Sequence, residues 1–203
     1  MIDPKQKLNM ILSGEYFPRL GFVEPIIYGN DAFDTSVSED TAFSDVLESG
    51  IDVLIGAKYN LPESREAVLR TLEMCEKAGL LYLVRDSESF ADRTREQAEN
   101  YFRTEYKDIS RFASFAGVSP VDEPGYVSWD KAKKFRRAFN KVFPDKLYYI
   151  NLLQNYAPSW AITNGASRED DLPSDDDYDF YCKSYVRQAD PPLFCYDFYP
   201  FRE

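Results

Sequence analysis

Short apolar runs alternate with segments of helical periodicity along most of the chain. The apolar runs are rich in branched and aromatic residues and predict strands, whereas the segments between them repeat apolar residues every three or four positions and predict amphipathic helices. We expect strands at 21–29, 51–59, 80–86, 115–121, 146–154 and 192–201, and helices at 41–50, 62–79, 94–112, 128–143 and 178–187. The pattern therefore predicts a repeated strand–helix unit.

Local signals mark the ends of several predicted helices. Gly50 and Gly79 each follow an apolar helical stripe, where glycine suits the left-handed residue that ends a helix. Thr94 and Gln97 have the spacing of a capping box, and Ser128 stands where its side chain can cap the helix that follows.

The repeated unit predicts an α/β fold. The strands lack the alternation of a half-exposed sheet, which indicates a parallel sheet covered by helices. A unit of about 30 residues is typical of the (β/α)8 TIM barrel of roughly 250 residues, and about six units are visible here, so we expect an incomplete barrel. The alternative is an open, doubly wound parallel sheet, which needs no further strands. We expect a single domain over 1–203, with 1–20 as an N-terminal extension.

Polar side chains gather at the carboxyl ends of the predicted strands, where barrel enzymes build their sites. Acids and amides hydrogen-bond sugar hydroxyls, and aromatic rings lie against the apolar face of a pyranose, so the set predicts a carbohydrate partner. Arg85 and Asp86 are expected to form an ion pair at the rim. The candidates are Tyr28, Lys58, Tyr59, Asn60, Asp86, Asp122, Glu123, Asn151, Asn155, Tyr156, Asp197 and Tyr199.

Composition excludes several other classes. The net charge of −11 argues against nucleic acid or an anionic membrane as partner. The chain has no His, which removes histidine-based catalysis and imidazole-bound metal, and its three Cys are well separated and are expected to be core thiols. Without a glycine-rich phosphate loop we expect no organic cofactor. As written, the chain shows no signal peptide and is expected in the cytoplasm; secretion or a periplasmic location is the alternative if a leader has been removed.

Three segments together carry a family resemblance. "VDEPG" at the end of the fourth predicted strand, "YYINLLQNYAP" and "FCYDFYPF" resemble the catalytic-domain pattern of bacterial TIM-barrel glycoside hydrolases, over roughly Gly50 to Phe201. In the large retaining clan of such barrels, this resemblance implies that Glu123 is the acid/base. That clan takes its nucleophile from a seventh strand, which is not visible in this chain.

A second group of barrels, the substrate-assisted hexosaminidases that include glycoside hydrolase family 123, also carries an adjacent Asp-Glu pair on strand four. The resemblance to them implies that Asp122 orients the acetamido group of the substrate while Glu123 acts as acid/base. It also implies nearby aromatic residues, for which the candidates are Tyr126, Trp129, Tyr156, Trp160 and Tyr199.

Other interpretations stay open. An Asp-Glu-Pro-Gly sequence between a strand and a helix is also a common polar turn. A barrel that lacks its last strands could bind carbohydrate without turnover. It could also be an interaction protein or oligomer that pairs through open edges at its first and sixth strands.

Overall fold

A computed structural model describes residues 2–21, 38–56, 64–163 and 177–195. They form an α/β fold around one parallel sheet of five strands in the order β1-β2-β3-β4-β5, each strand beside the next in sequence. The parallel sheet predicted from the sequence is confirmed. The strands are β1 (Leu20–Gly21), β2 (Val53–Ile55), β3 (Leu81–Arg85), β4 (Phe115–Ser119) and β5 (Leu147–Tyr148).

The two outer predicted strands fall largely outside the described residues. Residues 22–29 of the first predicted strand and 196–201 of the last lie outside the described residues. At the boundary of the last one, the Leu152 N–H donates to the Cys195 carbonyl oxygen at 3.1 Å, which joins this segment to the chain beyond β5.

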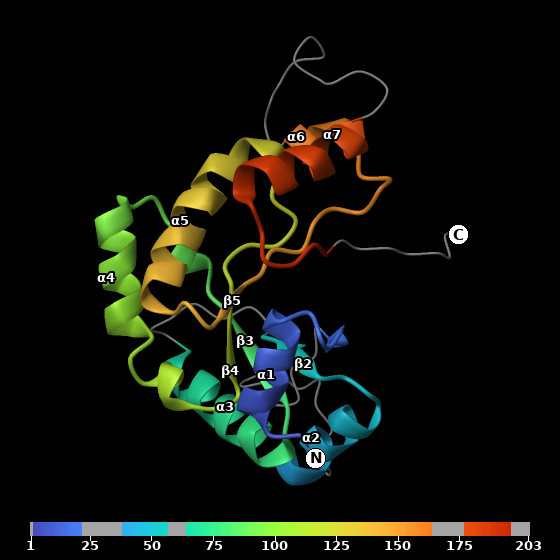
Figure 1. The fold of residues 1–203 in the computed structure, drawn as a ribbon, viewed down its shortest axis with the longest axis vertical. Helices are drawn as coiled ribbons and strands as arrows, with labels where there is room; N and C mark the ends of the chain where they lie inside the picture. Colours follow the sequence, from blue (N-terminus) through green and yellow to red (C-terminus); the bar gives the residue numbers. More distant parts are fainter. Residues whose placement is uncertain (1, 22–37, 57–63, 164–176, 196–203) are drawn as a thin grey trace.

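Helices connect the strands (Figure 1). The α-helices are α1 (Pro4–Leu12), α2 (Glu39–Glu48), α3 (Arg65–Ala78), α4 (Arg95–Glu105), α5 (Trp129–Val142), α6 (Ser159–Thr163) and α7 (Asp177–Ser184). Short turns add η1 (Ser87–Phe90), η2 (Ile109–Arg111), η3 (Tyr126–Ser128) and the π-helical η5 (Tyr185–Ala189). Among the described residues, no helix has the length and apolar character needed to cross a membrane.

The predicted helix ends are mostly confirmed. Thr94 and Gln97 form the capping box of α4, and Gly79 ends α3 with φ of +76°. Ser128 precedes α5 but makes no side-chain cap bond, because the turn η3 places it in a helical conformation instead of the extended one that a capping side chain needs. The prediction of one helix over 94–112 is wrong at its end, since α4 stops at Glu105 and η2 follows separately.

Strand residues alternate between two apolar layers. Leu54, Tyr82 and Tyr148 point toward the layer that contains side chains of α2, α3, α4 and α5. Their neighbours Val53, Leu81 and other strand residues point toward a smaller layer that contains Leu8 and Ile11 of α1. Both faces of the sheet are therefore covered, which explains why the strands read as continuous apolar runs.

A buried ion pair anchors α1 beneath the sheet. Lys7 of α1 and Asp52, which precedes β2, are both almost fully buried, with 3.5 Å between Nζ and Oδ1. Lys7 Nζ also donates to the Gly79 carbonyl oxygen at 3.0 Å, and the Tyr16 hydroxyl donates to Asp52 at 2.7 Å. Within the predicted extension 1–20, the described residues 2–20 therefore pack on the sheet through both apolar and charged contacts.

An irregularity in β4 depends on glycine. The register between β3 and β4 shifts after Tyr82, so that Leu83 pairs with Gly117. Gly117 has φ of +151°, and a Cβ on it would lie 1.9 Å from the Leu147 carbonyl oxygen of β5. Only glycine fits this close approach of two backbones. The register shift means that β4 has one more residue than β3 at this point. This extra residue determines which side chains of β4 face each layer just before the chain reaches Asp122.

The upper part of the molecule is built by α6, α7 and η5, beyond the carboxyl end of β5 (Figure 1). Trp129, at the start of α5, is fully buried against them, with its ring 5.2 Å from Tyr181 and 4.8 Å from Tyr185. Its indole N–H donates to the Ser184 hydroxyl at 2.9 Å. Trp129 therefore belongs to the core, and its candidacy as a pocket-lining ring is wrong.

Candidate functional site

The predicted carboxylate pair lies at the carboxyl end of β4. Asp122 forms an isolated parallel bridge with Asn151, so the chain beyond β4 still runs beside the chain beyond β5. Arg85, at the end of β3, donates to Asp122 Oδ2 at 3.1 Å, and Asn151 Nδ2 lies 3.4 Å from Asp122 Oδ1. Three neighbouring strand ends therefore meet at Asp122, and both of its oxygens have a partner.

The Asn151 side chain extends this network away from the pair. Cys195 Sγ lies 3.5 Å from Asn151 Oδ1, and the Tyr149 hydroxyl donates to Cys195 Sγ at 3.0 Å. Asn151 is almost fully buried, so these contacts fix its amide. Cys75 is buried as predicted, whereas Cys182 and Cys195 are only half-buried, which corrects the prediction of three core thiols.

Glu123 has an unusual backbone conformation. Its φ is +47°, in the left-handed region that non-glycine residues rarely occupy. Its N–H donates to the Asn151 carbonyl oxygen at 3.0 Å, and the next carbonyl, that of Pro124, accepts from the Tyr181 hydroxyl at 2.8 Å. Such a conformation costs about 1–2 kcal/mol and persists where the surroundings impose it, which is common at functional sites.

This strain predicts the relative stability of two variants. Because glycine adopts positive φ without a steric penalty, Glu123→Gly should be more stable than Glu123→Ala by about 1 kcal/mol, measured by urea unfolding. Arg137, exposed in the middle of α5, is the control, since glycine there should be less stable than alanine by about 1 kcal/mol. An alanine variant as stable as the glycine variant at 123 would contradict the assigned conformation.

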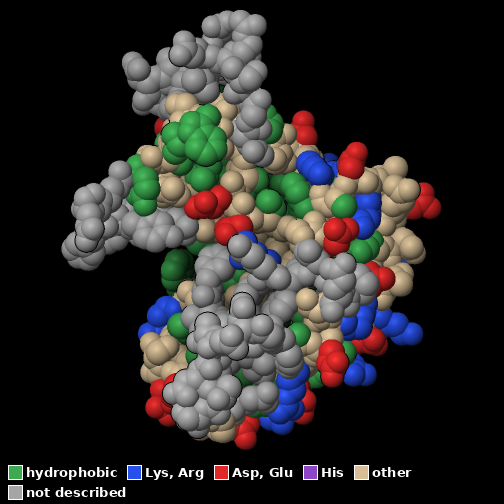
Figure 2. All heavy atoms as spheres, turned by 180° about the vertical axis from the view of Figure 1, so that it is seen from behind, with side chains coloured by type: hydrophobic (Ala, Val, Ile, Leu, Met, Phe, Trp, Pro, Cys, Tyr) green, Lys and Arg blue, Asp and Glu red, His purple; other side chains and the backbone are tan. Residues whose placement is uncertain are grey.

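Aromatic candidates lie near the pair, on the turn after it and on the helices above. The Tyr126 ring of η3 contacts the Phe180 ring of α7 edge to face, with 5.5 Å between centroids. Trp160 of α6, which packs near η3 and α7, is 73% exposed. Figure 2 shows hydrophobic side chains gathered on the upper part of one face, with acidic side chains just below them. Asn155 is exposed and Tyr156 half-buried, on the loop that leads to α6.

Asp86 does not belong to this group of side chains. Successive strand residues point to opposite faces, so Arg85 reaches Asp122 while Asp86 points into the helical layer. There it is fully buried and accepts from the Tyr101 and Tyr106 hydroxyls, each at 2.8 Å. The expected Arg85–Asp86 rim pair is therefore wrong, and Asp86 cannot touch a substrate in this arrangement.

Asp86 predicts a pH dependence of stability. Burial raises the pKa of Asp86, although the two tyrosine hydroxyls oppose this by stabilising the anion. The stability associated with its protonated form is complete below the unfolded pKa of about 3.9 and is lost as pH rises through the folded value. Asp86→Asn, which stays neutral, should therefore be most destabilising near pH 4 and least near pH 7, measured by urea unfolding. A larger loss at pH 7 would contradict the raised pKa.

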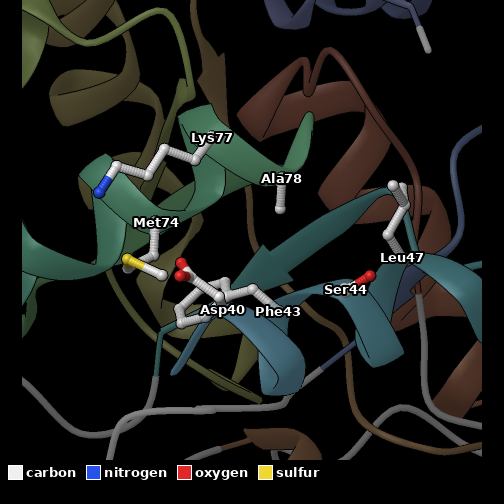
Figure 3. Close-up of a pocket in the computed structure, with 7 residues that line it drawn as sticks. All are labelled: Asp40, Phe43, Ser44, Leu47, Met74, Lys77 and Ala78. Atoms are coloured by element: carbon white, nitrogen blue, oxygen red, sulfur yellow. The ribbon is translucent and has the colours of Figure 1, made fainter. Parts of the chain in front are cut away.

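The cavities with defined linings lie elsewhere. One of about 210 Å³ lies between α2 and α3 and is lined by Asp40, Phe43, Met74 and Lys77, among others (Figure 3). Another, of about 380 Å³, follows the polar surface of α4 around Arg93 and Tyr101. Neither includes a residue of the carboxylate pair.

Some candidates lie outside the described residues. These are Tyr28, Lys58, Tyr59, Asn60, Asp197 and Tyr199. In the described ranges, no three acidic or cysteine side chains come together as a metal site would require. The sequence interpretation named Arg85 but not its contact with Asp122, which depends on strand pairing, and it missed Tyr181, whose contact with Pro124 depends on how α7 packs. No protein-family model matches the chain, and no curated protein sequence matches it.

Proposed function

We propose that this protein is a carbohydrate-active, glycoside hydrolase-like protein whose Asp122–Glu123 pair hydrolyses a glycosidic bond. The observation that carries the proposal is the left-handed conformation of Glu123, held at the carboxyl end of a central parallel strand. A polar turn alone would gain nothing from a glutamate in a strained conformation, whereas a fixed direction of its carboxyl group serves catalysis.

The contacts of Asp122 suggest separate roles for the two acids. Arg85 and Asn151 each contact one oxygen of Asp122 and fix its orientation. A fixed carboxylate suits orientation of an acetamido group on the substrate, whose oxygen would form a bond to the anomeric carbon as the bond to the leaving oxygen breaks and Glu123 protonates that oxygen. Water would then attack the anomeric carbon, release the acetamido oxygen and give its proton to Glu123. This division makes an N-acetylated sugar the preferred substrate class, and it needs no second carboxylate as nucleophile.

The order of the strands in the sheet favours a barrel over a doubly wound sheet. Barrels place each strand beside the next in sequence, whereas doubly wound sheets reverse the order at a switch point. The described sheet runs from β1 to β5 without reversal. A (β/α)8-type barrel, of which five strands are described, is therefore the finer fold that we propose, with the substrate at the carboxyl ends of the strands.

Sugar binding without turnover is the second candidate. It is favoured by Trp160, because an indole that is 73% exposed offers a face to the apolar side of a pyranose whether or not a bond is broken. Under this function, Asp122 and Asn151 would serve only as hydrogen-bonding groups.

Hydrolysis of a panel of nitrophenyl glycosides that includes N-acetylhexosaminides tests the proposal. The expected result is turnover by the wild-type chain and by Glu96→Gln, an exposed glutamate on α4, with preference for the N-acetylated substrates. Turnover of neutral sugars alone would contradict the role of Asp122. Absence of turnover by a folded, monodisperse chain would reject hydrolysis in favour of binding.

A further inference from the structure

Tyr181 joins the two segments that impose the conformation of Glu123. Its hydroxyl donates to the Pro124 carbonyl oxygen at 2.8 Å and accepts from the Leu153 N–H at 3.3 Å. Pro124 directly follows Glu123, and Leu153 lies two residues after Asn151, whose carbonyl binds the Glu123 N–H. We propose that Tyr181 is a positioning residue, which holds Glu123 in the left-handed conformation and thereby aims its carboxyl group.

Tyr181 is itself rigidly held. Its side chain is fully buried, and its ring packs on Trp129 with 5.2 Å between centroids. The Ser184 hydroxyl accepts from the Trp129 indole N–H and donates to the Tyr181 carbonyl oxygen, each at 2.9 Å. Because these contacts hold Tyr181 in place, its hydrogen bonds can hold the backbone of the turn at Pro124 in one conformation.

The protonation state of Tyr181 suits the role. Burial raises the pKa of its hydroxyl well above the ordinary value, and the negative charge of Glu123 acts in the same direction. The hydroxyl therefore stays protonated at neutral pH and remains a donor to the Pro124 carbonyl.

The first test compares Tyr181→Phe with Tyr185→Phe. The second variant removes another buried hydroxyl from the Trp129 surface and is the matched control. Because a small misplacement of a reacting group lowers turnover strongly, kcat of Tyr181→Phe should fall about tenfold or more while KM changes less than about twofold. The control should keep both values. Unchanged kcat in Tyr181→Phe would overturn the positioning role.

The second test needs no activity and is therefore independent of the proposed function, on which the kinetic test rests. A left-handed residue gives a strong nuclear Overhauser effect between its own amide and Hα protons, and this signal at position 123 should weaken in Tyr181→Phe. The folding equilibrium constant of Glu123→Gly should exceed that of Glu123→Ala about fivefold when Tyr181 is present, and the ratio should fall to about one in the Tyr181→Phe background.

The two tests separate the possible failures. If the wild-type chain hydrolyses no glycoside, the proposed function fails, while the proton signal and the glycine-to-alanine ratio still decide whether Tyr181 imposes the conformation. A strong signal and an unchanged ratio in the Tyr181→Phe background would overturn the inference. If that background is unfolded in buffer, the same comparison is made in sucrose, which favours the folded state.

Discussion

Replacing Glu123 by Gln is expected to lower kcat/KM for aryl glycosides with poor leaving groups by about 10²–10⁴-fold, the usual contribution of a general acid. Gln has nearly the shape of Glu and keeps the backbone bond to Asn151, but it cannot donate an acidic proton. Stability should change little, since Glu123 is only half-buried. The measurement is the initial rate of methylumbelliferyl release, with folding checked by circular dichroism.

The leaving group separates an acid from a binding residue. Dinitrophenolate leaves without protonation, so Glu123→Gln should lose much less activity on dinitrophenyl glycosides than on methylumbelliferyl ones. The control Glu96→Gln should match the wild-type chain on both. An equal loss on both substrates would show that Glu123 contributes binding or geometry and not a proton.

Replacing Asp52 by Asn is expected to lower the free energy of unfolding by about 3 kcal/mol near pH 7, because it leaves the Lys7 ammonium group buried without its counter-charge. Lys7 and Asp52 are only 6% and 7% exposed. The Tyr16 hydroxyl donates to Oδ1 and the Arg19 N–H to Oδ2, and Asn keeps only one of these two acceptors, so the loss combines the missing charge with one missing hydrogen bond. Urea unfolding measures the effect, which should also loosen α1 from the sheet.

The effect of Asp52→Asn should depend on pH in the opposite sense to that of Asp86→Asn. Burial by itself would raise the pKa of Asp52, but the Tyr16 hydroxyl, the Arg19 N–H and the charge of Lys7 together lower it. Its contribution is therefore complete above about pH 3.9 and is lost as pH falls through the lower folded value. The gap between wild type and Asp52→Asn should shrink in acid.

Glu73→Gln is the control for the Asp52 experiment. Glu73 also contacts two cations, with Arg70 at 2.9 Å and Lys77 at 3.2 Å, but all three lie at the surface of α3. Surface ion pairs contribute little because water screens them. We expect no measurable loss from Glu73→Gln, and a loss as large as that of Asp52→Asn would contradict the importance of burial.

The sequence predicted the parts of the fold that depend on local pattern. Apolar runs and helical stripes placed β2 to β5 and α2 to α5, and the capping box at Thr94 placed the start of α4. These signals come from residues near one another in the chain. The packing of α1 was not predicted, because it depends on the Lys7–Asp52 pair, whose partners lie far apart in the sequence.

The sequence predicted the central residues of the candidate site but not the contacts and backbone conformation that hold them in place. The position of Asp122, Glu123 and Asn151 follows from strands that end at the same edge. The opposite directions of Arg85 and Asp86 depend on the exact strand register, and a glutamate in a left-handed conformation has no sequence signature. Trp129 and Trp160 look alike in sequence, yet only packing of the upper helices decides that one is buried and the other exposed.

Mapping a bound sugar by nuclear magnetic resonance is the most direct test of the central claim that carbohydrate binds at the Asp122–Glu123 edge. The probes are N-acetylglucosamine and glucose, titrated into the isotopically labelled chain. We predict that N-acetylglucosamine shifts the backbone amides of Asp122, Glu123 and Tyr126 and the indole of Trp160, while the amides around the α2–α3 cavity stay unchanged. Shifts confined to that cavity, or no shifts with either sugar, would contradict the account.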